Sequence, residues 1–210
     1  MSLNPDTQFS KERIEMLCDG VFAIAMTLLV LDLKVPEVPK ATPAIEVWHM
    51  IGEHGLSFFA YGLTFLLAGQ FWIIHHVFFH YLRHATRSIA ILTLFWLLFV
   101  SLLPFTTSMF ARFGPRPAGM IPYLANQTIL ASLVGVQWLV ARSQGLLTGS
   151  ADDPRRRRFT VALVALPTLF GCVLAGELIT PGSPAWTLIL GAAVVFLVRR
   201  RLDRRAAAAS

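Results

Sequence analysis

Long apolar runs constrain the fold of this chain more than any other feature of its sequence. A helix needs about 20 predominantly apolar residues to span the hydrocarbon core of a bilayer. Six segments meet that length: 13–33, 55–81, 88–111, 120–141, 159–179 and 185–202. They fill nearly all of the 210 residues and leave no room for a soluble catalytic domain. The sequence therefore predicts an all-α membrane protein, with residues 1–210 forming one six-helix transmembrane domain.

The composition supports a membrane location. Hydrophobic residues make up 55% of the chain and charged residues 14%, against about 25% charged in a typical soluble domain. Residues 1–12 are polar and lack the apolar core of a signal peptide, so we expect the first helix itself to direct insertion. Cys18 and Cys172 fall inside predicted helices and form no CxxC pair, which favours packing roles over a disulfide or a metal site.

Basic residues are distributed unequally between the two sides of this topology. Six spans place both termini on one side, and fourteen of the eighteen lysines and arginines fall there. Cytoplasmic loops are enriched in Lys and Arg, so we expect a multi-pass protein of the cell membrane with both termini in the cytoplasm. Nucleic-acid binding is disfavoured because the basic runs flank membrane spans. One run is a candidate site for anionic lipid headgroups: Arg155, Arg156, Arg157 and Arg158.

The first span bears an apolar stripe. At 100° per residue, Ile24, Leu28 and Leu31 lie within about 60° of arc on the helix surface, and Thr27 flanks them. Such a stripe suits the lining of a pore in an oligomer, because one stripe cannot enclose a pore and several copies must face one axis. It equally suits packing against a neighbouring helix or lipid, and periodicity does not separate these interpretations.

Polar groups at membrane depth predict a structural network. Arg13 and Asp19 belong to the first span, and charges in such positions usually face protein or water. Their separation of six residues places them on different helix faces, so each is expected to bind a different neighbouring helix. His75 and His76 of the second span are the natural partners, and the sequence does not decide which of the two joins the network.

Two other functions stay open at this point. A redox protein or enzyme that uses haem or a quinone needs histidines on two facing helices at one depth, and only the second span offers histidines. A proton-permeable or proton-coupled transporter needs an acidic residue near the middle of the membrane. Asp19 and Glu177 are both expected nearer the membrane surfaces, with Glu177 in a solvated position.

The first span resembles the first helix of the transmembrane protein 175 family of potassium channels. That family opens the helix with Arg-x-x-x-Phe-Ser-Asp, followed by small and branched apolar residues. Arg13, Asp19 and residues 20–25 match this pattern, whereas Leu17 and Cys18 replace the phenylalanine and the serine. The loss of the serine hydroxyl implies that one hydrogen bond of the family's helix-packing network is missing here.

The resemblance extends along the chain through the six-span layout and the pattern Trp72-x-x-His75-His76. In this family, animal members carry two six-helix repeats and assemble as dimers, and bacterial members carry one repeat and assemble as tetramers. The resemblance therefore implies a bacterial-type homotetramer with four first helices around a central axis.

The resemblance also implies which residues form the pore. The isoleucine five residues after the motif aspartate is the family's narrowest constriction, and Ile24 holds that position here. Leu28 and Leu31 follow on the next turns, and Thr27 matches a threonine proposed to contribute to selectivity. The chain lacks a Thr-Val-Gly-Tyr-Gly filter, so selection would depend on this apolar constriction. The implied activity is passive potassium conduction without a cofactor.

Overall fold

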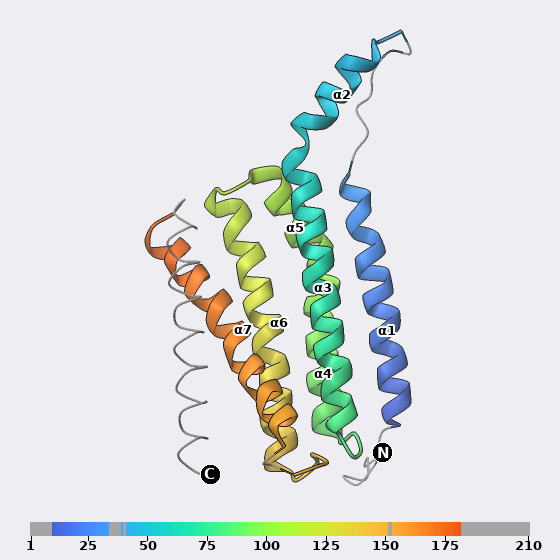
Figure 1. Cartoon of the computed structure of the whole chain (residues 1–210), viewed down its shortest axis with the longest axis vertical. Helices are drawn as coiled ribbons and strands as arrows, with labels where there is room; N and C mark the ends of the chain where they lie inside the picture. Colours follow the sequence, from blue (N-terminus) through green and yellow to red (C-terminus); the bar gives the residue numbers. More distant parts are fainter. Residues whose placement is uncertain (1–9, 34–38, 40, 151–152, 182–210) are drawn as a thin grey trace, which may run out of the picture.

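The computed structural model describes residues 10–33, 39, 41–150 and 153–181, which form helices joined by short loops (Figure 1). No β-strand occurs within these ranges, and an isolated bridge joins Leu82 to Leu147. The helices are α1 (Lys11–Leu28), the 3-10 helix η1 (Leu29–Asp32), α2 (Ala44–Glu53), α3 (Gly55–Tyr81), α4 (Arg87–Ser101), α5 (Leu103–Phe113), α6 (Pro117–Ser143) and α7 (Pro154–Ile179). The prediction of an all-helical chain is confirmed for this part of the protein.

Five segments of the described chain are long and apolar enough to cross a membrane: Lys11–Leu31, Gly55–Tyr81, Arg87–Phe113, Pro117–Ser143 and Pro154–Ile179. They correspond to the first five predicted spans, and the second coincides with its prediction at both ends. The sixth predicted span, 185–202, lies outside the described residues, so the six-helix repeat stays a prediction.

The five spans run alternately up and down, with α1 at one edge of the described bundle and α7 at the other (Figure 1). The start of α1 and the loops after α3 and α6 lie at one end, whereas α2 projects from the opposite end (Figure 1). The first end holds Lys11, Arg83, Arg87, Arg142 and residues 155–158. The charge segregation expected from the sequence is therefore present in the fold, and its assignment to the cytoplasm stays a prediction.

The third span is broken rather than continuous. The sequence predicts one helix over 88–111, but α4 ends at Ser101 and α5 begins at Leu103. Pro104 explains the break, because proline has no N–H to donate to the carbonyl four residues earlier and its ring crowds that carbonyl. The carbonyl of Leu102 instead accepts from the backbone N of Thr106 at 3.0 Å.

Aromatic packing joins α1 to the helices beside it. α1 packs against α3 and α4, and its Phe22 ring lies 5.2 Å from the Trp96 ring of α4, centroid to centroid. Trp96 is fully buried and donates its indole N–H to the carbonyl of Leu130 in α6 at 3.1 Å. Because polar groups in a bilayer must find partners within the protein, this bond ties α4 to α6 at membrane depth.

Small residues bring α6 and α7 together. A Cβ atom added at Gly135 of α6 would lie 3.4 Å from the carbonyl oxygen of Leu163 in α7. Small residues permit such close backbone approach, which stabilises membrane helices through van der Waals contact. The two helices are thereby held as a pair on the side of the described bundle opposite α1 (Figure 1).

Glu177 is buried, contrary to the solvated position expected from its place near the end of a span. It is 1% exposed and lies one turn beyond Val173 on the same face of α7. Val173 packs in an apolar cluster with Met120, Tyr123 and Leu124 of α6. The orientation of α7 against α6, rather than the distance of Glu177 from the helix end, therefore decides its burial.

Candidate pore-lining helix

The two faces of α1 differ in what covers them. Cys18, Phe22, Ala25 and Leu29 are buried in the bundle. The opposite face presents the predicted stripe, with Ile24 61%, Leu28 43% and Leu31 70% exposed. Spacings of three and four residues account for this division, because they place side chains on one face of a helix. The structure thus brings the three stripe residues onto an apolar surface that the described part of the chain leaves uncovered.

A local change of helix type alters the upper part of the stripe. Residues Leu29–Asp32 form the 3-10 helix η1, which has about three residues per turn, so side chains three apart eclipse one another. Leu31 therefore lies more nearly in line with Leu28 than an α-helix would place it. Two leucines consequently stand along one line of the exposed face, beyond Ile24.

Thr27 lies beside this stripe and is also exposed. Its hydroxyl oxygen is 2.9 Å from the carbonyl oxygens of both Ala23 and Ile24. A hydroxyl has one proton to donate and two acceptor lone pairs, so the helix backbone takes the proton. The oxygen is left as an acceptor on the exposed side, which is the polarity that a passing cation requires.

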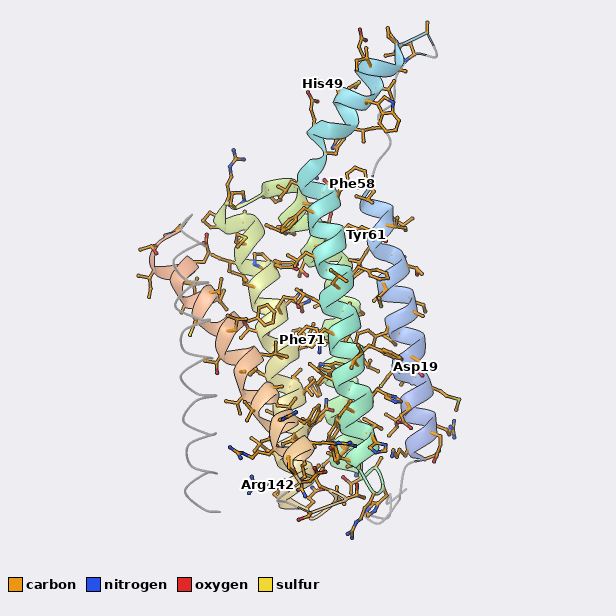
Figure 2. All side chains as sticks on the ribbon, viewed as in Figure 1. Asp19, His49, Phe58, Tyr61, Phe71 and Arg142 are labelled. Atoms are coloured by element: carbon orange, nitrogen blue, oxygen red, sulfur yellow. The ribbon has the colours of Figure 1, made fainter. Side chains whose placement is uncertain are left out.

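The partner of Asp19 is a tryptophan and not a histidine. Trp72 of α3 donates its indole N–H to the Asp19 carboxylate at 2.7 Å, and Figure 2 shows Asp19 in the N-terminal half of α1. The Trp72 ring stacks on His76, with centroids 5.9 Å apart and an interplanar angle of 22°. His76 therefore touches the predicted network only through Trp72.

His75 is held differently from its neighbour. It is buried and stacks on the Trp96 ring with centroids 4.4 Å apart and planes 11° apart. Its Nε2 atom lies 4.0 Å from the Sγ atom of Cys18. Cys18 is a free, buried cysteine, so the residue that replaces the family's serine still meets a polar atom of α3.

A cavity of about 180 Å³ brings most of this network together. It is lined by Glu15, Cys18, Asp19, Trp72, His75 and His76. Arg13, the fourth predicted member, is exposed, and among the described residues its side chain forms no hydrogen bond or ion pair. The predicted tie between Asp19 and the second span is therefore present, but it runs through Trp72 rather than a histidine, and among the described residues Arg13 has no such partner.

Sequence reasoning missed the role of Trp72, although a signal was present. Trp72, His75 and His76 are spaced by three and four residues, which gathers them on one side of α3. An indole N–H at membrane depth needs an acceptor, and Asp19 is the acidic residue of the first span at the matching depth. Among the described residues, no group of three or more His, Cys, Asp or Glu side chains could hold a metal ion.

Comparison with known proteins identifies the family. The model of the endosomal/lysosomal potassium channel TMEM175 family matches residues 13–104, which include α1, α3 and α4. A protein of Streptomyces collinus named a potassium channel is 31% identical over 177 residues, covering 80% of this chain and 84% of that protein. The human protein named endosomal/lysosomal proton channel TMEM175 is 39% identical over 111 residues, and this match spans 22% of its length.

Solved structures share the fold. The crystal structure of a TMEM175 homologue from Chamaesiphon minutus, described as a lysosomal potassium-selective channel, superposes with a TM-score of 0.70 at 22% identity. It covers 92% of this chain and 98% of the homologue. The match to the Streptomyces protein extends over most of both chains, and the chain belongs to the TMEM175 family.

Proposed function

We propose that this protein is a potassium-permeable cation channel in which four α1 helices surround a central pore. The observation that supports the proposal most directly is the exposed apolar face of α1, opposite a face that is buried in the bundle. A soluble protein would leave no such helix face in water, and a lipid-facing helix has no need of Thr27 beside it. A homotetramer places this face of each subunit against the shared axis.

Conduction in this arrangement is passive. Ile24, Leu28 and Leu31 of four subunits form successive apolar rings that exclude water when they meet. An ion that passes such a ring must shed part of its hydration shell, and a potassium ion sheds water more readily than a sodium ion. The Thr27 oxygens, whose protons are taken by the helix backbone, supply acceptors next to the rings.

The Asp19–Trp72 hydrogen bond positions the pore helix. It joins α1 to α3 at 2.7 Å, and α3 is in turn bonded to the rest of the bundle. The rotation of α1, and therefore which side chains reach the axis, depends on such fixed points. Asp19 and Trp72 are accordingly structural residues that support the pore without lining it.

The surroundings of the channel follow from the same proposal. It lies in the cell membrane as a multi-pass protein with both termini in the cytoplasm, and the bilayer is its principal partner. Anionic lipids are expected at the start of α7, where the run Arg155, Arg156, Arg157 and Arg158 lies, without every arginine of the run contacting a headgroup. No bound cofactor is required, and potassium is the permeant ion.

Proton permeation is the second candidate, because the animal relatives are named proton channels. A redox role has less support: His75 is the only buried histidine among the described residues, and no second helix in that part of the chain faces it with another histidine. Ion flux and proton flux are separable in one liposome preparation by a potassium gradient and an internal pH dye.

The test is potassium flux together with crosslinking at the proposed axis. Leu28→Cys should form disulfide-linked subunits in an oxidised sample, and in a separate reduced sample a thiol-reactive reagent should modify the free Cys side chains and block potassium flux in liposomes. Leu66→Cys, an exposed position on α3, is the matched control and should leave flux intact after the same treatment. Absence of flux in the parent protein, or equal effects at both positions, would contradict the proposed pore.

A further inference from the structure

A cavity of about 180 Å³ lies where α6 ends and α7 begins, away from α1. Its lining consists of Trp138, Arg142, Arg156, Arg157 and Thr160. Among the described residues, the lining thus offers three guanidinium groups, one hydroxyl and one indole ring, and no carboxylate. Figure 2 shows Arg142 at the end of α6 that carries the basic loops. This chemistry suits an anionic group with several acceptor oxygens.

The central arginine of the cavity is held in place. Arg156 donates from Nη1 to the carbonyl of Gly149 at 3.1 Å, and its Cζ atom lies 5.8 Å from the centroid of the Trp138 ring. Two contacts of this kind fix a side chain that is otherwise costly to order. The remaining N–H donors of the fork are therefore oriented before any ligand arrives.

The loop that supports Arg156 is itself fixed to α3. Thr148 donates its backbone N–H to the carbonyl of Tyr81 at 2.7 Å, and Arg83 donates to the carbonyl of Leu146 at 2.9 Å. The Gly149 carbonyl therefore follows directly on a loop segment that these backbone hydrogen bonds hold in place. The cavity is formed by side chains of both α6 and α7, with Arg156 held by the loop between them, rather than by a row of arginines on one helix.

The four arginines of residues 155–158 differ in whether they line the cavity. Arg156 and Arg157 line the cavity together with Arg142 of the other helix, whereas Arg155 and Arg158 lie outside its lining. Arg155 is exposed, and Arg158 borders a separate groove between α3 and α7. The nearby carboxylate of Asp153 is engaged at the helix start, where it accepts from the backbone N of Arg155 at 2.9 Å.

The membrane side of the cavity is apolar. Leu139 lies one turn from Arg142 toward the middle of α6, and Val136 lies one turn farther; both are exposed. Val164 lies one turn from Thr160 on α7 and is also exposed. An apolar surface thus runs from the cavity toward the centre of the spans, which is the path that an acyl chain takes below its headgroup.

We propose that this cavity binds the phosphate of an anionic phospholipid of the leaflet on the basic side. Arg142, Arg156 and Arg157 contact the phosphate oxygens, Thr160 donates its hydroxyl, and the acyl chains lie along Val136, Leu139 and Val164. Basic pockets between membrane helices on the cytoplasmic side bind such headgroups. A soluble phosphate shares the headgroup chemistry but gains nothing from the apolar surface.

The experiment compares two double variants of the full chain with the same change in charge. Arg142→Gln/Arg156→Gln removes two cavity arginines, and Arg155→Gln/Arg158→Gln removes two from outside it. Each purified protein is titrated in detergent with dioleoyl phosphatidylglycerol or dioleoyl phosphatidylcholine, and bound lipid is counted by native mass spectrometry. We expect the cavity variant to bind phosphatidylglycerol about 30-fold more weakly, because each of the two lost arginines contributes roughly 1 kcal/mol to the binding free energy. The outside variant should bind within a few-fold of the parent.

Equal loss in both variants overturns the proposal, because it indicates general attraction to a basic surface. No loss in the cavity variant, or equal binding of the two lipids by the parent, also overturns it. Displacement of phosphatidylglycerol by millimolar inorganic phosphate assigns the site to soluble phosphate and overturns the lipid assignment. If the double variant does not fold, Arg156→Lys keeps the charge without the planar fork, and it should still weaken phosphatidylglycerol binding several-fold.

Discussion

At the residue scale, the pore proposal depends on which side chains of α1 stay uncovered. Ile24 is more exposed than Leu28, and both belong to an α-helical segment, whereas Leu31 lies in η1. The three rings are therefore unequal, because each side chain leaves the helix at a slightly different angle. Ile24, which is branched at Cβ and so has few rotamers, is best suited to hold a fixed diameter.

Replacement of Ile24 tests the position of the narrowest ring. Ile24→Asn places four amides where four isoleucines stood, which admits water, so it should raise conductance and lower the preference for potassium over sodium. Leu28→Ala should change both quantities less, because the Ile24 ring would remain the bottleneck. Currents and reversal potentials in potassium and sodium measure the two effects. The opposite ranking would move the constriction by one turn.

The Asp19–Trp72 pair makes a prediction about stability. Asp19→Ala and Trp72→Phe each remove one partner of the bond, so each should destabilise the folded protein. A double-mutant cycle should give a coupling energy of about 0.6 kcal/mol and at most about 1.7 kcal/mol, the average and the largest values seen for hydrogen bonds between membrane helices. Thermal or denaturant unfolding in detergent measures it. His76→Phe is the control, because its ring stacks on Trp72 without bonding Asp19. Strict additivity of the two changes would contradict a direct bond.

At the scale of helices, close approach and interruption shape the bundle. α6 and α7 meet at Gly135, where an added Cβ would lie 3.4 Å from the Leu163 carbonyl oxygen, in van der Waals contact that leaves little space for a larger side chain. The third span is interrupted at Leu102, because Pro104 has no N–H to continue the helical hydrogen bonds. The close approach of α7 to α6 lies on the side away from α1, and the resulting orientation of α7 buries Glu177 and places Arg156 and Arg157 beside Arg142.

A bulky side chain at Gly135 should separate α6 from α7. Gly135→Leu forces its side chain against the Leu163 backbone, and overpacking of this kind costs about 1–3 kcal/mol. Gly69→Leu on α3 is the matched control, because a Cβ there would meet no atom within 4 Å. Thermal unfolding in detergent should show a lower transition for the α6 variant alone. Equal transitions would show that the two helices do not approach as closely as the backbone indicates.

At the scale of the whole molecule, one chain leaves groups that a neighbour is expected to meet. The apolar face of α1 is uncovered, and so is the side chain of Arg13, which the described part of the chain does not pair. Arg13 precedes Ile24 by eleven residues, which is about three full helical turns, so it lies on the same side of α1 as the stripe. Both features are therefore placed to contact other subunits at the proposed axis.

Replacement of Asp19 should destabilise the subunit itself, whereas replacement of Arg13 should weaken the contacts between subunits. Asp19→Ala removes a bond inside the subunit, so it should lower both the unfolding temperature and the yield of tetramer. Arg13→Ala should lower the yield of tetramer with little effect on the subunit's own stability, because no partner within the described chain is lost. Native mass spectrometry and thermal unfolding of both variants separate these effects. An unchanged tetramer yield for Arg13→Ala would place its role elsewhere.

The sequence by itself determined the elements and their distribution of charge. The α3 helix matches the predicted span 55–81, because the length and period of apolar runs are local properties of the chain. The stripe of Ile24, Leu28 and Leu31 was likewise visible, since helical spacing alone places these residues on one face.

Only the tertiary structure decided which groups meet. Asp19 binds Trp72 rather than a histidine, and of the two neighbouring histidines only His75 is buried. Glu177 is buried in the bundle. Arg142 of α6 and Arg156 of α7 line one cavity. Each outcome depends on how a helix is rotated and which helix lies beside it. That choice minimises the energy of the whole bundle and is not encoded in the spacing of residues along one segment.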